Sequence, residues 1–95
     1  MTLEEFLKHT AERKPLCGPE IGQFMNEMSD EARRITCQMN GSYHTPDEIR
    51  ELLAQLTGQP IPATVRVFPP LYADFGKNIH LGEEVFINDC CHFQD

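Results

Sequence analysis

The stretch that decides the fold runs from Val67 to Asp95 and reads VFPPLYADFGKNIHLGEEVFINDCCHFQD. Two apolar series repeat within it every six residues, a smaller one at Ala73, Ile79, Val85 and Cys91 and a larger one at Phe75, Leu81, Ile87 and Phe93. A short fixed period is typical of stacked small units, none of which buries its apolar face alone. Successive turns of the chain must then lie on one another, so we expect the start of a β-helix.

The same period predicts the size of each turn and the filling of its interior. Three six-residue units make one triangular coil, so residues 70–95 hold fewer than two coils. We expect the larger apolar series to line up in one shared column inside the coils. Because the last coil presents unpaired backbone groups as a sheet edge, we also expect the chain to associate in solution.

Helical patterns precede this stretch. Residues 2–14 predict a short amphipathic helix, and a second helix is predicted to begin near Phe24 or Ser29, beyond a segment interrupted by proline and glycine, and to stop at Asn40. The sequence Thr45-Pro46-Asp47-Glu48 is a capping box with proline at the first helical position. It predicts a third helix that ends at Thr57-Gly58, because Gly58 is a helix-terminating residue followed by prolines.

The change from helical to six-residue periodicity marks a boundary near Gly58, beyond which Thr64 to Val67 alternates as a strand should. We therefore predict an α+β fold in two regions. Residues 1–58 form an N-terminal helical region, and residues 59–95 begin a hexapeptide-repeat β-helix that is truncated here.

Composition limits the function classes. The 95 residues include 8 Lys and Arg against 15 Asp and Glu, a net charge of −7 that repels nucleic-acid phosphates and anionic lipids. Without a long apolar run or an apolar leader, we expect a cytoplasmic protein with no membrane or nucleic-acid partner. The four cysteines lack a CxxC spacing, so we expect reduced thiols and no metal site.

Residues 69–95 resemble the first coils of the maltose and galactoside O-acetyltransferases, members of the hexapeptide-repeat acyltransferase superfamily. The helical region resembles the N-terminal maltose acetyltransferase region of that family less specifically. The matching residues are Pro69-Pro70, Asp74, Phe75-Gly76, Asn78-Ile79-His80-Leu81-Gly82, Phe86-Ile87-Asn88 and Asp95.

The resemblance implies a left-handed parallel β-helix, a homotrimer with active sites between subunits, and transfer of acetyl from acetyl-CoA to a hydroxyl of maltose, glucose or a galactoside. General chain physics favours right-handed crossovers in about 98% of parallel connections, so the left hand comes from the resemblance alone. The family's catalytic histidine falls roughly 20 to 25 residues beyond Asp95, and the repeats that bind acetyl-CoA come later. We therefore expect no catalytic residue in this chain and no activity from it alone.

Four residues are carried over as acceptor-binding. The counterpart of Asn88 lies in the acceptor pocket near the catalytic histidine, although an asparagine at this position is also typical of a corner. Asp74 and Asp95 match acceptor-side polar positions and can accept hydrogen bonds from sugar hydroxyls. Phe86 replaces a tyrosine of the galactoside enzymes, so it can shape a pocket but cannot donate a hydrogen bond.

Other polar residues are assigned structural or solvated roles. His80 and His92 have no carboxylate near them in sequence that would orient an imidazole as a base. The pair Arg33-Arg34 is interpreted as a solvated helix face. Glu20 and Ser29 fall near the family's acceptor-binding acid and arginine, and neither role is transferred.

Two other functions stay open from the sequence. One is a non-enzymatic, acidic helical interaction module that associates through Leu52, Leu53, Leu56 and the exposed coil edge. The other is a hexapeptide acyltransferase with a different acceptor, such as an amine or an antibiotic.

Overall fold

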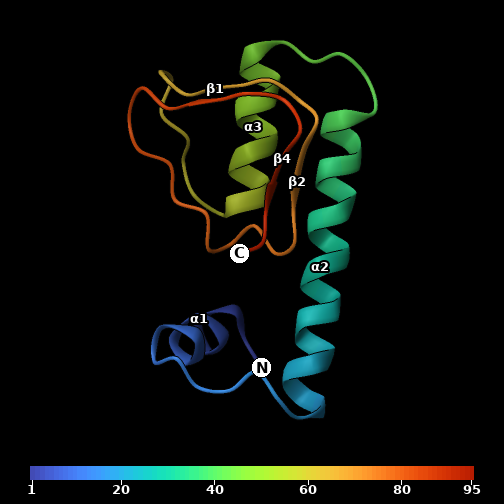
Figure 1. The fold of residues 1–95 in the computed structure, drawn as a ribbon, viewed down its shortest axis with the longest axis vertical. Helices are drawn as coiled ribbons and strands as arrows, with labels where there is room; N and C mark the ends of the chain where they lie inside the picture. The colour runs from blue at the N-terminus through green and yellow to red at the C-terminus, as the bar shows by residue number, and fades with distance from the viewer.

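Three helices precede four short strands in the computed structural model, which describes residues 1–95 (Figure 1). The elements are α1 (Leu3–Ala11), α2 (Pro19–Asn40), α3 (Pro46–Thr57), β1 (Arg66–Val67), β2 (Leu71–Ala73), β3 (Phe86–Ile87) and β4 (Cys91–Phe93). The α+β class is confirmed. None of the three helices combines the length and apolarity needed to cross a lipid bilayer.

The third helix is confirmed together with its capping box. The Glu48 amide donates to Thr45 Oγ1 at 3.3 Å, and the Thr45 amide donates to Glu48 Oε1 at 2.8 Å. This backbone hydrogen bond from Thr45 is the main cause that holds the pKa of Glu48 below its ordinary value. Gly58 ends the helix in the left-handed region at φ 71°, where a glycine carries no Cβ strain.

The second helix begins earlier than predicted. Its first residue is Pro19, and Gly22 lies within its first turn, so the predicted start near Phe24 or Ser29 is wrong. Proline is well tolerated at a first helical position, because the amide that it lacks would have no intrahelical partner there. Burial farther along the helix outweighs the cost of about 1 kcal/mol for one glycine.

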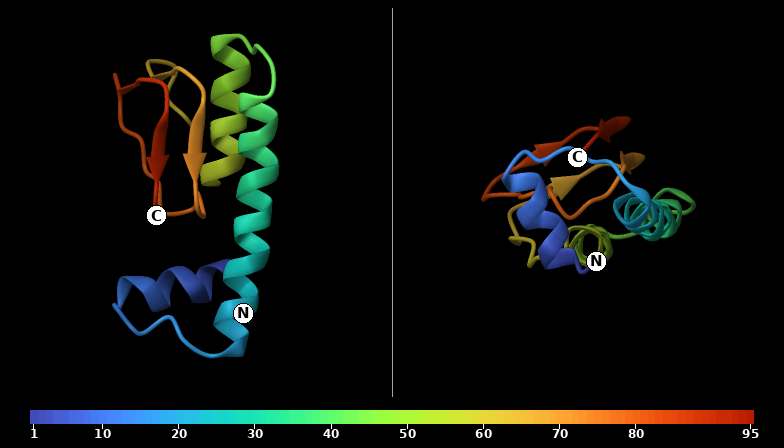
Figure 2. Two further views of the ribbon diagram at one scale, coloured as in Figure 1. Left: turned by 45° about the vertical axis from the view of Figure 1, so that its right-hand side comes forward. Right: turned by 90° about the horizontal axis from the view of Figure 1, so that it is seen from below.

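The four strands form two parallel pairs, β1 with β3 and β2 with β4. Figure 2 shows β2 and β4 side by side, pointing in the same direction, with α1 lying across the other end of the molecule. Arg66 lies opposite Phe86 and Leu71 lies opposite Cys91. The second pass of the chain therefore lies on the first, as the six-residue period predicted.

Two predictions about the β-region are wrong: the number of residues in one coil, and the alignment of the larger apolar series in a single column inside the coils. Paired residues are 20 apart, as in the hydrogen bond from the Phe75 amide to Asp95, rather than three hexapeptides apart. Phe93 consequently lies opposite Ala73, and Phe75 stands outside the column. Side chains alternate along a strand with period two, so a shift of two residues changes partners without turning either series outward.

One hydrophobic cluster joins the helices to the strands. It contains 13 buried residues from α2, α3 and the strands and connections of the β-region: Ala32, Ile35, Met39, Ile49, Leu52, Leu53, Leu56, Val65, Val67, Leu71, Ala73, Ile79 and Ile87. Leu81, Val85, Cys91 and Phe93 are partly buried against it. Both apolar series thus face inward apart from Phe75, and the division at residues 58 and 59 stays a prediction.

Phe75 instead fastens α1 to the rest of the molecule. Its ring lies 5.2 Å from that of Phe6 between centroids, and Phe6 lies 5.0 Å from Phe24 of α2. Phe6 is the one buried residue of α1. This aromatic cluster holds α1 across the end of the coil, since such pairs contribute about 0.5–1.5 kcal/mol beyond the area that they bury.

The end of α3 is joined to the turn that follows β2. Lys77 is buried, and its Nζ donates to the carbonyl oxygen of Leu56 at 2.7 Å, with Glu31 at 3.6 Å completing an ion pair. A cation at a helix C-terminus satisfies carbonyls that have no intrahelical partner. Gly76 adopts φ 88° beside it and approaches the Leu56 backbone closely.

Candidate functional site

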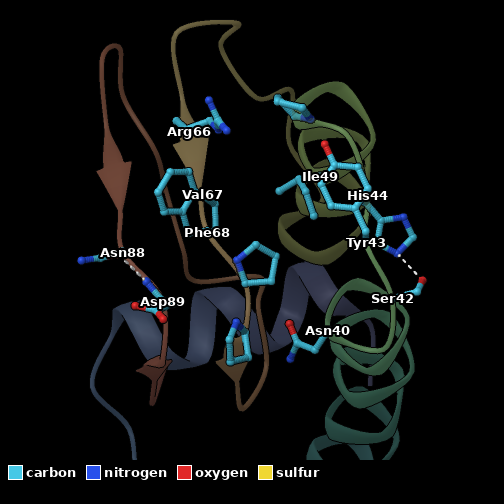
Figure 3. A pocket seen from close by; sticks show the side chains of 13 residues that line it. Asn40, Ser42, Tyr43, His44, Ile49, Arg66, Val67, Phe68, Asn88 and Asp89 are labelled. Carbon is cyan, nitrogen blue, oxygen red and sulfur yellow. Dashed lines mark hydrogen bonds between the residues drawn. The ribbon is translucent and has the colours of Figure 1, made fainter.

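A cleft opens where the paired prolines turn the chain, and we call it the corner cleft. Its volume is about 550 Å³, within the range of small-molecule sites. Figure 3 shows its side chains, which come from the end of α2, the α2–α3 connection, the start of α3, β1 with the corner that follows it, and the turn after β3. The lining residues are Asn40, Ser42, Tyr43, His44, Pro46, Ile49, Arg66, Val67, Phe68, Pro69, Pro70, Asn88 and Asp89.

A second cleft, the helix groove, lies between α2 and the outer face of β2 and β4. Its volume is about 560 Å³. The helix supplies one wall, and the other consists of the outward-facing Tyr72 and His92 together with Ala73 and Asp74 at the end of β2. The lining residues are Arg33, Thr36, Cys37, Asn40, Gly41, Tyr72, Ala73, Asp74 and His92.

A third cleft, the α1 cleft, lies between α1 and the end of the coil, with a volume of about 290 Å³. Its lining residues are Phe6, Thr10, Leu16, Met25, Ser29, Asp74, Phe75, Gln94 and Asp95. Adjacent clefts share a residue: Asn40 lines the corner cleft and the helix groove, and Asp74 lines the helix groove and the α1 cleft. The three clefts follow one another along α2, and we refer to them together as the track.

Asn40 positions the strand that runs beside this track. Its side-chain amide donates to the carbonyl of Leu71 at 2.9 Å, and its oxygen accepts from the amide of Leu71 at 3.0 Å. The side chain thus replaces a neighbouring strand at the free edge of β2. Because both of its polar groups are engaged, Asn40 holds the site together rather than offering groups to a ligand.

Asn88, the first predicted site residue, lies at the rim of the corner cleft. Its Oδ1 accepts from the amide of Asp89 at 2.9 Å, which is the corner-forming arrangement that the sequence left open. In Figure 3 the amide group points away from Asn40 and the helices. Asn88 is exposed, and its amide NH₂ remains available as a donor.

Asp74, the second predicted residue, lies where the helix groove meets the α1 cleft. Its Oδ1 is 2.9 Å from Nε2 of His92, and its backbone carbonyl accepts from the hydroxyl of Ser29 at 2.9 Å. Sequence reasoning set His92 aside because no carboxylate lies near it in the chain. The parallel pairing of β2 with β4 brings one within hydrogen-bond distance.

Asp95, the third predicted residue, lines the α1 cleft, and both of its carboxylate oxygens accept hydrogen bonds from the backbone. Its Oδ1 accepts from the amide of Phe75 and its Oδ2 from the amide of Asn78, each at 3.1 Å. The carboxylate thereby holds the turn that contains Gly76. Each oxygen retains a free lone pair that a ligand hydroxyl could use.

Phe86, the fourth predicted residue, lines none of the three clefts. It is 54% exposed on the outer face of β1 and β3, and its ring lies 5.0 Å from that of Phe68 in an edge-to-face arrangement. The guanidinium of Arg66 lies 4.9 Å from the Phe68 ring centroid. The structure thus brings Asn88, Asp74 and Asp95 to one track and leaves Phe86 on a neighbouring face.

Sequence reasoning missed Tyr72 and His92 as residues of this track. They lie opposite each other in the β2–β4 pair, their rings 6.3 Å apart between centroids. The alternation of Leu71, Tyr72 and Ala73 marks Tyr72 as outward-facing, but only the register shows what lies beside it. His80 pairs with Gln59 instead, at 2.8 Å, away from the three clefts.

No group of three His, Cys, Asp or Glu side chains is placed to hold a metal ion, and all four cysteines are free. Arginine appears once in the corner cleft and once in the helix groove. The α1 cleft contains no basic side chain. The track therefore lacks the several cations that a polyanionic ligand requires. No family model matches this chain, and no curated protein matches it either.

Proposed function

We propose that this chain forms the acceptor-binding side of an acetyl-CoA-dependent sugar O-acetyltransferase, built on the first coils of a left-handed parallel β-helix. The observation that carries the proposal is the stacking of β3 on β1 and β4 on β2 in a stretch that resembles that family. Paired prolines stand at the corner between the two sheets. Polar residues carried over from the resemblance lie along one track beside this stack.

In the proposed reaction, the acceptor hydroxyl oxygen bonds to the acetyl carbonyl carbon while the carbon–sulfur bond of the thioester breaks. The hydroxyl proton passes to a base and then to the departing thiolate, and the resemblance assigns that base to a histidine beyond Asp95. The residues described here bind and orient the acceptor. Asp74 contributes a carboxylate oxygen that forms no bond within the protein, and the Asn88 amide is a further donor at the outer rim of the corner cleft, away from Asp74.

The coenzyme is bound elsewhere in this proposal. The phosphates of coenzyme A call for several cations, and each cleft contains at most one arginine. Phe86 and Phe68, exposed together beside Asn88, support an arrangement in which this face meets a neighbouring subunit, as in the trimer that the resemblance implies.

The proposal is tested by acetyl transfer from acetyl-CoA in the protein expressed from its complete gene, with maltose, glucose and a galactoside as acceptors. Asp74→Asn keeps the size of the side chain but removes its charge. We expect it to lower kcat/KM about tenfold or more, because hydrogen bonds to charged groups contribute about 1.5–3 kcal/mol. Absence of turnover with every hydroxyl acceptor would defeat the proposal.

A further inference from the structure

We infer that α1 is exchanged between two copies of this chain, so that Phe6 of one copy occupies the aromatic site of the other. Phe6 and Thr10 are the residues that α1 contributes to the α1 cleft. In the exchanged form the cleft of each copy is therefore completed by side chains of its partner. The exchange does not depend on the proposed acetyl transfer, because it follows from how α1 is attached to the rest of the chain.

The attachment of α1 consists of one aromatic side chain and one ion pair. Phe6 is the only buried residue of the helix, and its ring lies 5.0 Å from that of Phe24 and 5.2 Å from that of Phe75 between centroids. The N-terminal ammonium lies 3.2 Å from the exposed carboxylate of Glu20. No hydrogen bond joins residues 1–17 to the rest of the chain. The helix can therefore detach as a unit without breaking any secondary structure.

The linker between α1 and α2 is free of the body of the protein. It comprises Glu12–Gly18, and every one of its residues is exposed. Its own contacts run back to α1: the amide of Arg13 donates to the carbonyl of Thr10, and the carbonyl of Pro15 lies 2.8 Å from Nε2 of His9. A linker of this length spans up to about 25 Å when extended, which allows α1 to reach a neighbouring copy.

The closed arrangement strains the linker. In Figure 1 the chain leaves the end of α1 and turns back toward the start of α2. Arg13 lies in this reversal at φ 55°, in the left-handed region that is unfavourable for residues other than glycine. An extended linker lets Arg13 return to an ordinary conformation. Short hinges under strain favour the exchange of an element between copies.

The surface that receives α1 makes the same contacts with the α1 of either copy. Beside it, Leu16 is 50% exposed and Met25 is 37% exposed, so the closed form leaves apolar surface uncovered at the α1 cleft. In a chain that self-associates, as the coil edge predicts, a second receiving surface lies near each α1. Because the contacts made are identical, the linker decides between the closed and the exchanged form.

The test uses the amide that a carbodiimide forms between the N-terminal amine and the carboxylate of Glu20, which lie 3.2 Å apart. Isotope-labelled and unlabelled protein are refolded together from urea at high concentration, cross-linked, digested and analysed by mass spectrometry. Exchange joins labelled to unlabelled peptides in about half of the cross-linked pairs when the copies mix at random. Pairs of a single label only would overturn the inference.

Two substitutions in the linker test the hinge. Arg13→Gly removes the strain of the closed form, so it should lower the ratio of mixed-label to single-label pairs at least about fivefold. Lys14→Gly is the matched control, because it adds the same flexibility one residue along, where no positive φ is relieved. We expect that control to stay within about twofold of the parent protein. Equal ratios in the two variants would count against the exchange.

Two substitutions in α1 test the anchor. Phe6→Ala should remove both kinds of cross-linked pair, because α1 loses its only buried side chain. Lys8→Ala, at an exposed position of the same helix, should leave both kinds in place. Mixed-label pairs that survive in Phe6→Ala would mean that copies touch without docking of α1, and they would overturn the inference.

Discussion

Replacing Gly76 by alanine tests the joint between the coil and α3. Gly76 has φ 88°, and a Cβ built there would lie 2.5 Å from the carbonyl oxygen of Leu56 and 2.8 Å from its Cδ1. The left-handed conformation costs a non-glycine residue about 1–2 kcal/mol. Displacing a backbone carbonyl in a packed joint costs about 1–3 kcal/mol more. The expected loss is therefore about 2–5 kcal/mol, a large part of the roughly 5–15 kcal/mol of a typical domain.

The loss is measured by urea denaturation followed by circular dichroism, and by the thermal midpoint, which should fall by at least about 8 °C. Gly82→Ala is the matched control, because a Cβ there meets nothing within 4 Å and the residue has no positive φ. We expect that control to stay within about 0.5 kcal/mol of the parent protein. A Gly76→Ala protein as stable as the Gly82→Ala protein would refute the close approach of this turn to α3.

Three further predictions concern the anchor of β2, the cap of α3 and the exposed aromatic pair. Asn40→Ala should lower the free energy of unfolding, measured by urea titration, by about 1–3 kcal/mol, because the backbone of Leu71 loses both of its hydrogen-bond partners. Asn26→Ala, on the exposed side of α2, is the control and should change it by less than about 0.5 kcal/mol. The lowered pKa of Glu48 means that the unfolded chain binds its proton more readily, so this contribution to stability is present above the ordinary pKa of 4.5 and is lost as pH falls through the lower folded value. Glu48→Gln should therefore have a shallower decline of the urea midpoint between pH 6 and pH 3, and an unchanged decline would contradict the capping role. Phe86→Ser should weaken self-association in sedimentation velocity without shifting the urea midpoint, since the side chain is 54% exposed; an unaltered sedimentation profile would remove this face as an interface.

The parts of the fold that local chemistry determines could be predicted from the sequence. The box formed by Thr45 and Glu48 and the left-handed Gly58 define α3, because cap residues act on groups within one turn. The inward alternation of the coil residues was also predictable, since strand side chains alternate with period two. The start of α2 at Pro19 was not, because proline and glycine near a helix start resemble a loop in sequence.

The register between the paired strands could not be predicted from the sequence. A six-residue pattern reports which side chains face inward, but it does not report how many residues the corners use. The turn at Gly76 and the corner at Glu84, which also has a positive φ of 57°, both lie within the 20 residues that separate paired positions. A change of two residues preserves the pattern and changes every cross-strand partner.

That register also explains why the helix groove could not be inferred from the chain alone. Asp74 and His92 are 18 residues apart in sequence, so a register of three hexapeptides would also have brought them together, whereas the pairing of Tyr72 with His92 requires the observed register. A register based on three hexapeptides would have placed Asp74 directly opposite His92 on every coil and put Tyr72 beside Cys90. The observed register instead places two rings opposite each other, with the carboxylate at their edge and Arg33 across the groove. The two extra residues in the turns therefore decide which side chains of β2 and β4 face the helix groove together.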